Sequence, residues 1–349
     1  MAAPRSPVSR PSPSTSSRLR SEGEMDETDW VSAHAFYQGD QDRLLVDAID
    51  PLVTELTSGG RAEGWFYLRY WDGGPHLRLR VLPAPGVKAD EVREAIDTRL
   101  GAYFRDHPSN PVMTEETYAQ SAAMLAEWEQ VELGFAALQP NDSVIHVPYR
   151  REHHRYGHGA AIEAVERHFV QSSTLAMRLL RQGASPQERS TAAYAMILIA
   201  WLSCEPDPVR LREGVGSGPR YDDAVAPFEL PKPSAQQLGA AVSIAQRMRA
   251  LVTVSSRHTD PGTLASWARS VAALRDALDE QLDRGALTPP VSGWEGPGGL
   301  VIARPDTSAL TVIDICAHLI CNRLAVTLPA EISLRQLAGA AVMALAEGE

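Results

Sequence analysis

Four basic side chains cluster around one predicted hairpin. Arg69 ends an apolar run, a Trp-Asp-Gly-Gly-Pro turn follows, and the next run carries His76, Arg78 and Arg80. Alternation along a strand places His76, Arg78 and Arg80 on one face. Neighbouring cations repel one another unless an anion or a strong hydrogen-bond acceptor lies among them. This face is therefore either a substrate site or a solvated surface paired with nearby acids.

A second polar cluster contains Glu152, Arg155 and Tyr156, directly before Gly157. Glu152 and Arg155 are spaced to pair with each other or with the hairpin arginines. Tyr156 is a candidate proton donor, and Gly157 suits a backbone turn into the helix that follows.

A third cluster lies on a predicted helix, where His318 and Asn322 stand four residues apart and share one stripe. The rest of this stripe is mainly apolar. Because buried polar groups need hydrogen-bond partners, His318 and Asn322 are either structural or part of a site.

The elements that must position these clusters are those of an α+β chain. Hydrophobic periodicity predicts the following elements before residue 150: strand 30–37, helix 42–56 with a kink at Pro51, strands 65–70 and 76–81, helix 89–104 and strand 143–147. This order is typical of a split βαβ (ferredoxin-like) layer, a mainly antiparallel sheet with helices on one face. A helical layer follows, with helices near 159–182, 187–203, 233–256, 263–285, 308–326 and 331–346 and long loops at 205–232 and 286–299.

The chain divides into two parts. Residues 1–28 are rich in Ser, Pro and Arg and are predicted to be a disordered extension; Met25 is a candidate start, and we expect truncation to Met25 to leave activity intact. Residues 29–349 are predicted to form one catalytic domain, with a sheet layer at about 29–150 and a helical layer at about 151–349.

Composition excludes several classes of protein. There is no apolar run of the roughly 18 residues that a membrane span needs. The 33 basic and 44 acidic side chains give a net charge of −11, which argues against general nucleic-acid binding. Cys204, Cys316 and Cys321 are too few for a disulfide framework and suit a reducing cytoplasm, and neither they nor His153 and His154 have the spacing of metal ligands. We expect buried free thiols, exposed histidines at 153 and 154, and a cytoplasmic protein with no nucleic-acid or membrane partner.

Three motifs together resemble a known family. They occur in family order: WFYLRYWDGGPHLRLRV at 65–81, Y..E..RYG at 149–157 followed by Phe169 and Ser172, and H...NRL at 318–324. They are similar to the elimination domain of lantibiotic dehydratases and its thiopeptide-type bacteriocin biosynthesis relatives, over roughly Trp30 to Leu345. The resemblance implies an enzyme that acts on a modified precursor peptide with a leader and a dehydrated, azole-bearing core. It also implies possible contacts with other enzymes of the pathway, and a homodimer is a further expectation because relatives often pair.

Two chemistries occur in this family. Elimination domains remove glutamate from glutamylated Ser or Thr, and by motif their functional residues correspond to Arg78, Arg80, Glu152, Arg155 and His318. A second branch resembles pyridine synthases, which join two dehydroalanines in a formal [4+2] aza-cycloaddition and then release water and the leader peptide. Gln171 replaces an acid that usually precedes the Ser of the elimination pattern, and His318-Leu319-Ile320 lacks a second histidine. These departures favour the cyclase. A third hypothesis is a non-catalytic module that binds the leader by strand addition to the sheet edge.

The resemblance and the residue types together give one predicted site without a metal or cofactor. The predicted catalytic residues are His318, Tyr156, Glu152 and Ser172, with Ser292 as an unranked candidate. The predicted substrate-binding residues are Arg69, His76, Arg78, Arg80, Arg155 and Asn322.

Overall fold

The computed structural model describes residues 28–129, 133–214, 233–255, 261–288 and 309–348. The predicted extension at 1–28 lies outside these residues except for residue 28, as do the candidate start Met25 and the candidate Ser292.

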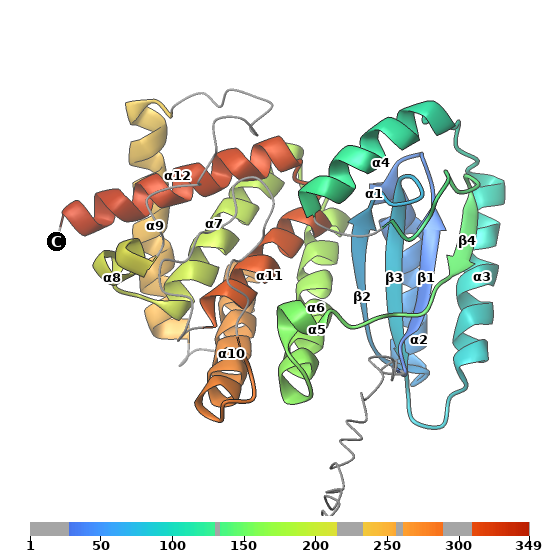
Figure 1. Ribbon diagram of the computed structural model, residues 1–349, viewed down its shortest axis with the longest axis horizontal. Coiled ribbons are helices and arrows are strands. Elements are labelled where there is room, and N and C mark those ends of the chain that lie inside the picture. Colours follow the sequence, from blue (N-terminus) through green and yellow to red (C-terminus); the bar gives the residue numbers. More distant parts are fainter. Residues whose placement is uncertain (1–27, 130–132, 215–232, 256–260, 289–308, 349) are drawn as a thin grey trace, which may run out of the picture.

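The N-terminal part forms a four-stranded antiparallel sheet, seen on the right of Figure 1. The strands are β1 (Val31–Phe36), β2 (Ala62–Tyr70), β3 (His76–Pro83) and β4 (Ser143–His146). Their spatial order is β2-β3-β1-β4. The helical connections therefore join β1 to β2 and β3 to β4, each pair having one strand between its members. All four predicted strands are confirmed to within a few residues.

Helices cover the apolar face of this sheet. They are α1 (Gln41–Arg43), the π-helical turn η1 (Leu44–Ile49), α2 (Asp50–Ser58) and α3 (Ala89–Asp106). Asp40 begins the first of them, because its Oδ1 accepts hydrogen bonds from the backbone N–H groups of Asp42 and Arg43. The kink predicted at Pro51 takes another form: a π-helical turn directly precedes α2, in whose first turn Pro51 lies. A proline lacks the N–H of a regular α-helical hydrogen bond, and a π turn accommodates that loss.

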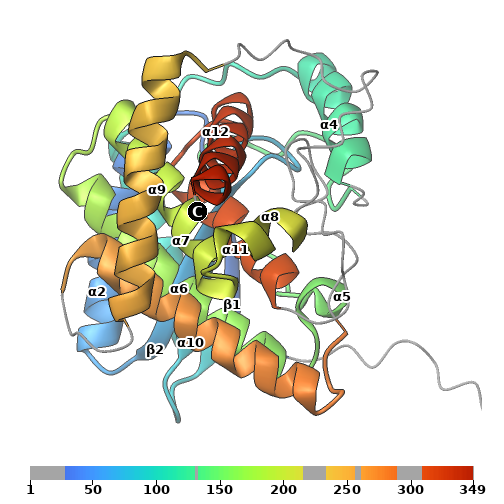
Figure 2. The ribbon, with the colours of Figure 1, turned by 90° about the vertical axis from the view of Figure 1, so that its left-hand side faces the viewer.

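A helical layer packs against the β2 edge of the sheet. Its long helices are α6 (Ala160–Arg181), α7 (Pro186–Cys204), α9 (Ala235–Ser255), α10 (Thr263–Asp283), α11 (Leu310–Arg323) and α12 (Leu328–Glu347). Both α6 and α11 contact β2, and Figure 2 shows α9, α10 and α12 around α7. Every residue from Ala193 to Ser203 in α7 is buried, so α7 is the centre of this layer. None of the described helices combines the length and the apolar character of a membrane-spanning segment.

Three short or weakly patterned helices were not predicted. They are α4 (Glu115–Glu129), α5 (His153–Tyr156) and α8 (Pro208–Gly214). Tyr118 and Ala122 are the buried apolar residues among the α4 side chains that the structure describes, a stripe too narrow to give a clear helical period. The expected loop at 205–232 is thus wrong at α8. The prediction of buried thiols is confirmed for Cys316 and Cys321, and Cys204 is partly buried.

Candidate active site

One face of the sheet carries polar and cationic side chains in rows. The pairing register places three residues of β1 opposite three of β3: Ser32 and Arg80, His34 and Arg78, Phe36 and His76. Directly opposed residues in a sheet project from the same face. The predicted alternation of His76, Arg78 and Arg80 is therefore confirmed, and His34 joins this set from the neighbouring strand.

This polar face is buried. His76 has no exposed surface, and Arg80 and His34 are 7% and 4% exposed. Phe135 packs with its ring centroid 5.9 Å from that of His34, and the ring centroid of Tyr149 lies 5.5 Å from the guanidinium carbon of Arg80. The alternative of a solvated outer surface is therefore wrong for these residues.

Several polar atoms of the buried face have no hydrogen-bond partner among the described residues. They are Ser32 Oγ, His34 Nδ1, His76 Nε2, and Nε and Nη1 of Arg80. Buried polar atoms are rarely left unsatisfied in a folded protein. We call Ser32, His34 and Arg80 the open donor cluster, because arginine, hydroxyl and imidazole groups can all donate to an anion or a carbonyl oxygen. His76 differs, because its Nδ1 already donates to the carbonyl of Gly74 and its unpaired Nε2 is an acceptor.

The two histidines of this face, His34 and His76, are held neutral. Their rings stack with centroids 4.8 Å apart. Burial lowers the pKa of His76 to about 3, against the opposing effect of a hydrogen bond to the Gly74 carbonyl, and the charges of Arg78 and Arg80 lower it further. Burial also lowers the pKa of His34, again with help from Arg80. At neutral pH each ring therefore keeps one donor and one acceptor nitrogen.

The two arginines of the face differ in their surroundings. Burial is the main reason why the pKa of Arg80 falls to about 9, and the nearby charge of Arg78 contributes. Nη2 of Arg80 lies 3.5 Å from Nε2 of His34, a long contact. The guanidinium of Arg78 lies over the ring of Tyr70, 3.3 Å from its centroid, which fixes its plane by a cation–π contact.

A segment between β4 and α5 lies across this face and is anchored to α6. Arg151 makes a bidentate ion pair with Glu166, with Nε and Nη2 each 2.8 Å from a carboxylate oxygen. Trp30 Nε1 donates to the same carboxylate at 3.3 Å. Because Arg151 is held in this way, Tyr149 two residues earlier is kept over Arg80. Glu166 is therefore a positioning residue for the covering segment.

The predicted Glu152 cluster is present at the end of this segment. Arg155 pairs with Glu152 at 3.3 Å, as the spacing predicted. Tyr156 is buried, and burial raises the pKa of its hydroxyl well above the ordinary value. Gly157 has a φ of 78°, and a Cβ at this position would lie 2.6 Å from Leu287, so the turn requires glycine.

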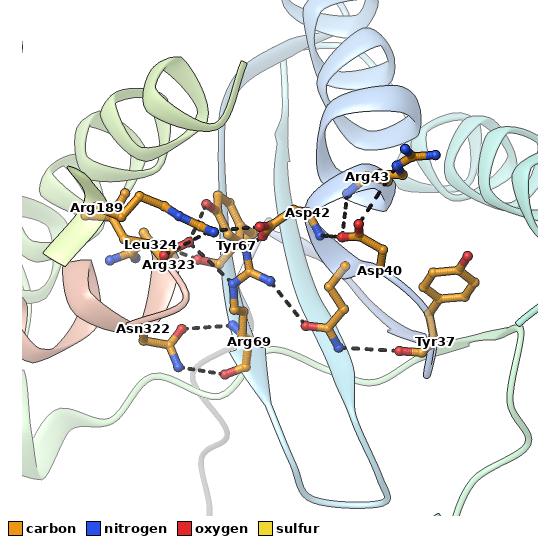
Figure 3. A network of polar contacts seen from close by, with 11 residues as sticks. Tyr37, Asp40, Asp42, Arg43, Tyr67, Arg69, Arg189, Asn322, Arg323 and Leu324 are labelled. Atoms are coloured by element: carbon orange, nitrogen blue, oxygen red, sulfur yellow. Dashed lines mark hydrogen bonds and ion pairs between the residues drawn. The ribbon is translucent and has the colours of Figure 1, made fainter. Parts of the chain in front are cut away.

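Asn322, a predicted substrate-binding residue, closes the outer edge of β2 (Figure 3). Its side-chain oxygen accepts from the backbone N–H of Arg69 and its side-chain nitrogen donates to the carbonyl of Arg69, both at 2.9 Å. It thus bonds to Arg69 as a neighbouring strand would. Arg323 Nε donates to the carbonyl of Tyr67, and Ser173 Oγ accepts from the N–H of Tyr67. Side chains therefore satisfy the backbone N–H and C=O groups of Tyr67 and Arg69 at the β2 edge, where another strand could otherwise pair.

Two further predicted residues have structural contacts. Arg69 pairs with Asp42, which also accepts from Arg189 at 2.8 Å, so its side chain joins the sheet layer to α1 and α7. Ser172 Oγ donates to the carbonyl of Phe169 one turn back in the same helix. The predicted roles of Arg69, Ser172 and Asn322 in the reaction stay predictions.

His318 lies on α11 and is held by α12. Its Nδ1 is 2.9 Å from Oε2 of Glu331, which has 1% of its side chain exposed, while 22% of the His318 side chain is exposed. Asn322, one turn further along α11, contacts Arg69 of β2, so α11 brings His318 to the β2 side of the sheet. That His318 shares a pocket with Arg78, Arg80 and Glu152 stays a prediction.

The structure adds three residues that the sequence did not single out: His34, Glu166 and Ser173. His34 lies on a predicted strand whose partner could not be read from the sequence. Glu166 and Ser173 stand on the buried side of α6 with Ile162 and Phe169, at spacings of three or four residues. A polar residue in an otherwise apolar stripe was the available signal.

Metal-ligand geometry is not found in the described part of the chain, where no three His, Cys, Asp or Glu side chains are grouped to hold an ion. His153 has another role: its Nδ1 lies 2.8 Å from the carbonyl of Gly157, and its ring stacks on that of His158 at 4.1 Å. Both histidines lie in the one-turn helix α5 and not in a loop. The predicted exposure is wrong for His153, which is partly buried, and is confirmed for His154.

Comparison with known proteins defines the class. Residues 30–342 match the family described as "Lantibiotic biosynthesis dehydratase C-term", and the chain belongs to this family. A search of curated proteins gave no significant match.

Among solved structures, the chain is similar to the pyridine synthase TbtD from thiomuracin biosynthesis, with a TM-score of 0.62 and 19% identity over 92% of this chain and 99% of that one. It is also similar to TsrL, with a TM-score of 0.53 and 15% identity over 92% and 95% of the two chains. The tRNA-dependent lantibiotic dehydratase MibB from Microbispora sp. 107891 gives a TM-score of 0.53 and 20% identity, and the match covers 93% of this chain but 29% of MibB. These likenesses establish a shared fold.

Proposed function

We propose that this protein is a pyridine synthase that matures a ribosomally made precursor peptide. In this reaction two dehydroalanines of a leader-bearing, azole-containing peptide join in a formal [4+2] aza-cycloaddition. Loss of water and of the leader peptide then gives a pyridine-centred macrocycle. Membership of the family and likeness to TbtD over 99% of that chain support this choice.

The observation that carries the proposal is the open donor cluster. The cycloaddition requires a backbone amide to become its iminol tautomer, so a donor must stabilise the amide oxygen while a base takes the amide proton. Arg80 and His34 supply such donors in a buried face, where a hydrogen bond to an amide oxygen is stronger than in water. Holding both alkenes in one site supplies the remaining rate enhancement through proximity.

Predicted roles for other residues follow from their positions. His318 is the proposed proton-transfer group, because its ring is partly exposed and one nitrogen is already fixed by Glu331. Glu152 and Tyr156 are further proton-transfer candidates at the edge of the covering segment. Arg78 and Arg155 are proposed to orient the peptide.

A second candidate function is elimination of glutamate from glutamylated Ser or Thr. It is favoured by Arg80, a buried arginine without an ion-pairing carboxylate among the described residues, since a glutamyl leaving group would supply that carboxylate. The departures at Gln171 and at Leu319-Ile320 from the elimination pattern weigh against it.

One pair of incubations separates the candidates by mass. A fully dehydrated, azole-bearing precursor should lose water and its leader, and the leader should appear as a released peptide. A glutamylated precursor should remain unchanged. Release of glutamate from the second substrate, with no change in the first, would replace the cyclase by the eliminase. Binding of either peptide without a mass change would make the protein a binding module.

Variants test whether the proposed residues act on the peptide. Arg78→Ala and His318→Ala should each lower turnover at least about tenfold, the low end for a positioned acid–base or orienting group. Full activity of a well-folded His318→Ala protein would make that histidine structural. A leaderless substrate should react more slowly than the full precursor, because leader binding increases the local concentration of the core.

A further inference from the structure

Four charged or ionisable residues connect α11 and α12 in a regular pattern. On α11, Asp314 and His318 stand four residues apart, and on α12 Glu331 and Arg335 do the same. His318 Nδ1 lies 2.9 Å from Glu331 Oε2, and Arg335 Nη1 lies 2.6 Å from Asp314 Oδ1. Arg335 Nε also donates to Glu331 Oε1 at 2.8 Å. The four side chains thus form a two-rung ladder between the helices.

A tight turn brings the two helical stripes face to face. α11 ends at Arg323 and α12 begins at Leu328. Ala325 between them has a φ of 56°, in the left-handed region that residues other than glycine rarely adopt. The N–H of Val326 bonds to the carbonyl of Cys321, which closes the end of α11. This strained backbone conformation at Ala325 forms the turn that places the two stripes opposite each other.

The ladder determines which nitrogen of His318 carries a proton. Burial alone would raise the pKa of the Glu331 carboxyl, but its interactions with His318 and Arg335, which include a hydrogen bond from each, outweigh burial and hold that pKa below its ordinary value. Glu331 is therefore a carboxylate, and a carboxylate only accepts hydrogen bonds. Nδ1 of His318 must be the donor in this contact, so the contact selects the tautomer with a proton on Nδ1 and an acceptor at Nε2.

Arg335 in turn fixes Glu331. Its guanidinium bonds to the two carboxylates of the ladder. Trp201, a residue of α7, also donates from Nε1 to Asp314 Oδ1 at 2.9 Å. Asp314, Glu331 and Arg335 are almost fully buried, so neither carboxylate can turn to solvent. The partly exposed ring of His318 is the end of the ladder that can meet a ligand.

We propose that Glu331 is a positioning residue that holds His318 in the Nδ1–H tautomer, with Nε2 presented as a proton acceptor to the peptide. The catalytic part of this inference rests on the proposed function, whereas the tautomer is a property of the protein alone. The closing experiment measures the two separately.

The tautomer is read by NMR on full-length protein labelled with ¹⁵N-histidine. Long-range ¹H–¹⁵N correlations distinguish the two neutral forms at a pH of about 8.5, above the ordinary histidine range. The His318 signals are those that disappear in His318→Asn. We expect the Nδ1–H form in the wild type, and a wild-type ring in the Nε2–H form would overturn the proposal without any further variant.

Two matched variants then test Glu331. Glu331→Gln and Asp314→Asn each remove one buried carboxylate from Arg335. Only the first of these carboxylates belongs to the ion pair with His318. We expect Glu331→Gln to shift the His318 signals toward the other tautomer and Asp314→Asn to leave them in place. Unchanged signals in Glu331→Gln, or equal shifts in both variants, would refute a specific role for Glu331.

Turnover gives the second readout. Glu331→Gln should lower kcat at least about tenfold with KM changed by less than about threefold, because it disturbs proton transfer and not peptide binding. Asp314→Asn should keep most of its kcat. If the wild type shows the Nδ1–H tautomer yet converts neither precursor peptide, the positioning stands and the proposed function fails.

Discussion

Arg335 and Arg80 are both buried arginines, and their surroundings are opposite. Arg335 lies between Asp314 and Glu331, and although burial lowers the pKa of an arginine, these two carboxylates raise that of Arg335 above its ordinary value. Arg80 has no ion-pairing carboxylate among the described residues, and burial lowers its pKa to about 9. The comparison teaches that burial alone does not define a role for a charge. A buried cation with its own carboxylates stabilises the fold, whereas one without them has unused capacity to bind a ligand.

The largest effect is expected at Arg335. Arg335→Met leaves two carboxylates facing each other in the interior without their cation. We expect the free energy of unfolding to fall by roughly 3–5 kcal/mol, as when one partner of a buried ion pair is removed. Urea denaturation followed by circular dichroism measures this. A loss under about 1 kcal/mol would show that the ladder is weaker than its distances suggest.

Arg80 should respond in the opposite sense. Arg80→Met leaves an apolar side chain and removes a buried charge that has no ion-pairing carboxylate among the described residues, so stability should stay level or rise by on the order of 1 kcal/mol. Turnover of the precursor peptide should nevertheless fall at least about tenfold. The same denaturation and mass assays serve both arginines, and a stability loss like that of Arg335→Met would end the contrast between them.

The edge of β2 gives an intermediate case, because the side-chain amide of Asn322 bonds to both backbone groups of Arg69. Asn322→Ala exposes the N–H and C=O of Arg69 without a partner, at an expected cost of about 1–3 kcal/mol. Ser172→Ala, which removes a hydroxyl bonded within its own helix, is the stability control and should cost less. Equal losses in the two variants would mean that Asn322 is not the main closure of this edge.

The last effect concerns pH. The pKa of His76 is about 3 in the folded state against 6.5 in the unfolded chain, so between these values the unfolded state binds one more proton. Stability is therefore present above pH 6.5 and is lost as pH falls, at about 1.4 kcal/mol per pH unit for each such histidine well inside this window.

His76→Leu should flatten the dependence of unfolding free energy on pH between about 6 and 4 by that amount. His168, whose pKa burial also lowers to about 3, remains in the variant and retains its share of the slope. Thermal or urea unfolding at several pH values provides the measurement. An unchanged slope would mean that His76 binds a proton in the folded protein as readily as in the unfolded one, and would contradict its neutral state.

The sequence by itself determined the strands, the long helices outside α4 and the faces of the strands. The hairpin at 71–75 and the cationic row of β3 followed from turn residues and the two-residue period of a strand, and the long helices followed from their apolar period. The resemblance carried by the three motifs led to the family that the comparison confirms. These features depend on neighbours along the chain, which is why one sequence suffices to find them.

Only the tertiary structure decided which polar residues meet. It paired His34 with the cationic row, tied Asn322 to the β2 edge and set His318 against Glu331. It also showed that the cationic face is buried and that Arg80 lacks a carboxylate partner within the described residues, where the sequence allowed a solvated surface. Strand register and helix facing arise from contacts between distant segments, and the periodicity of one segment fixes which side a residue takes but not what lies opposite.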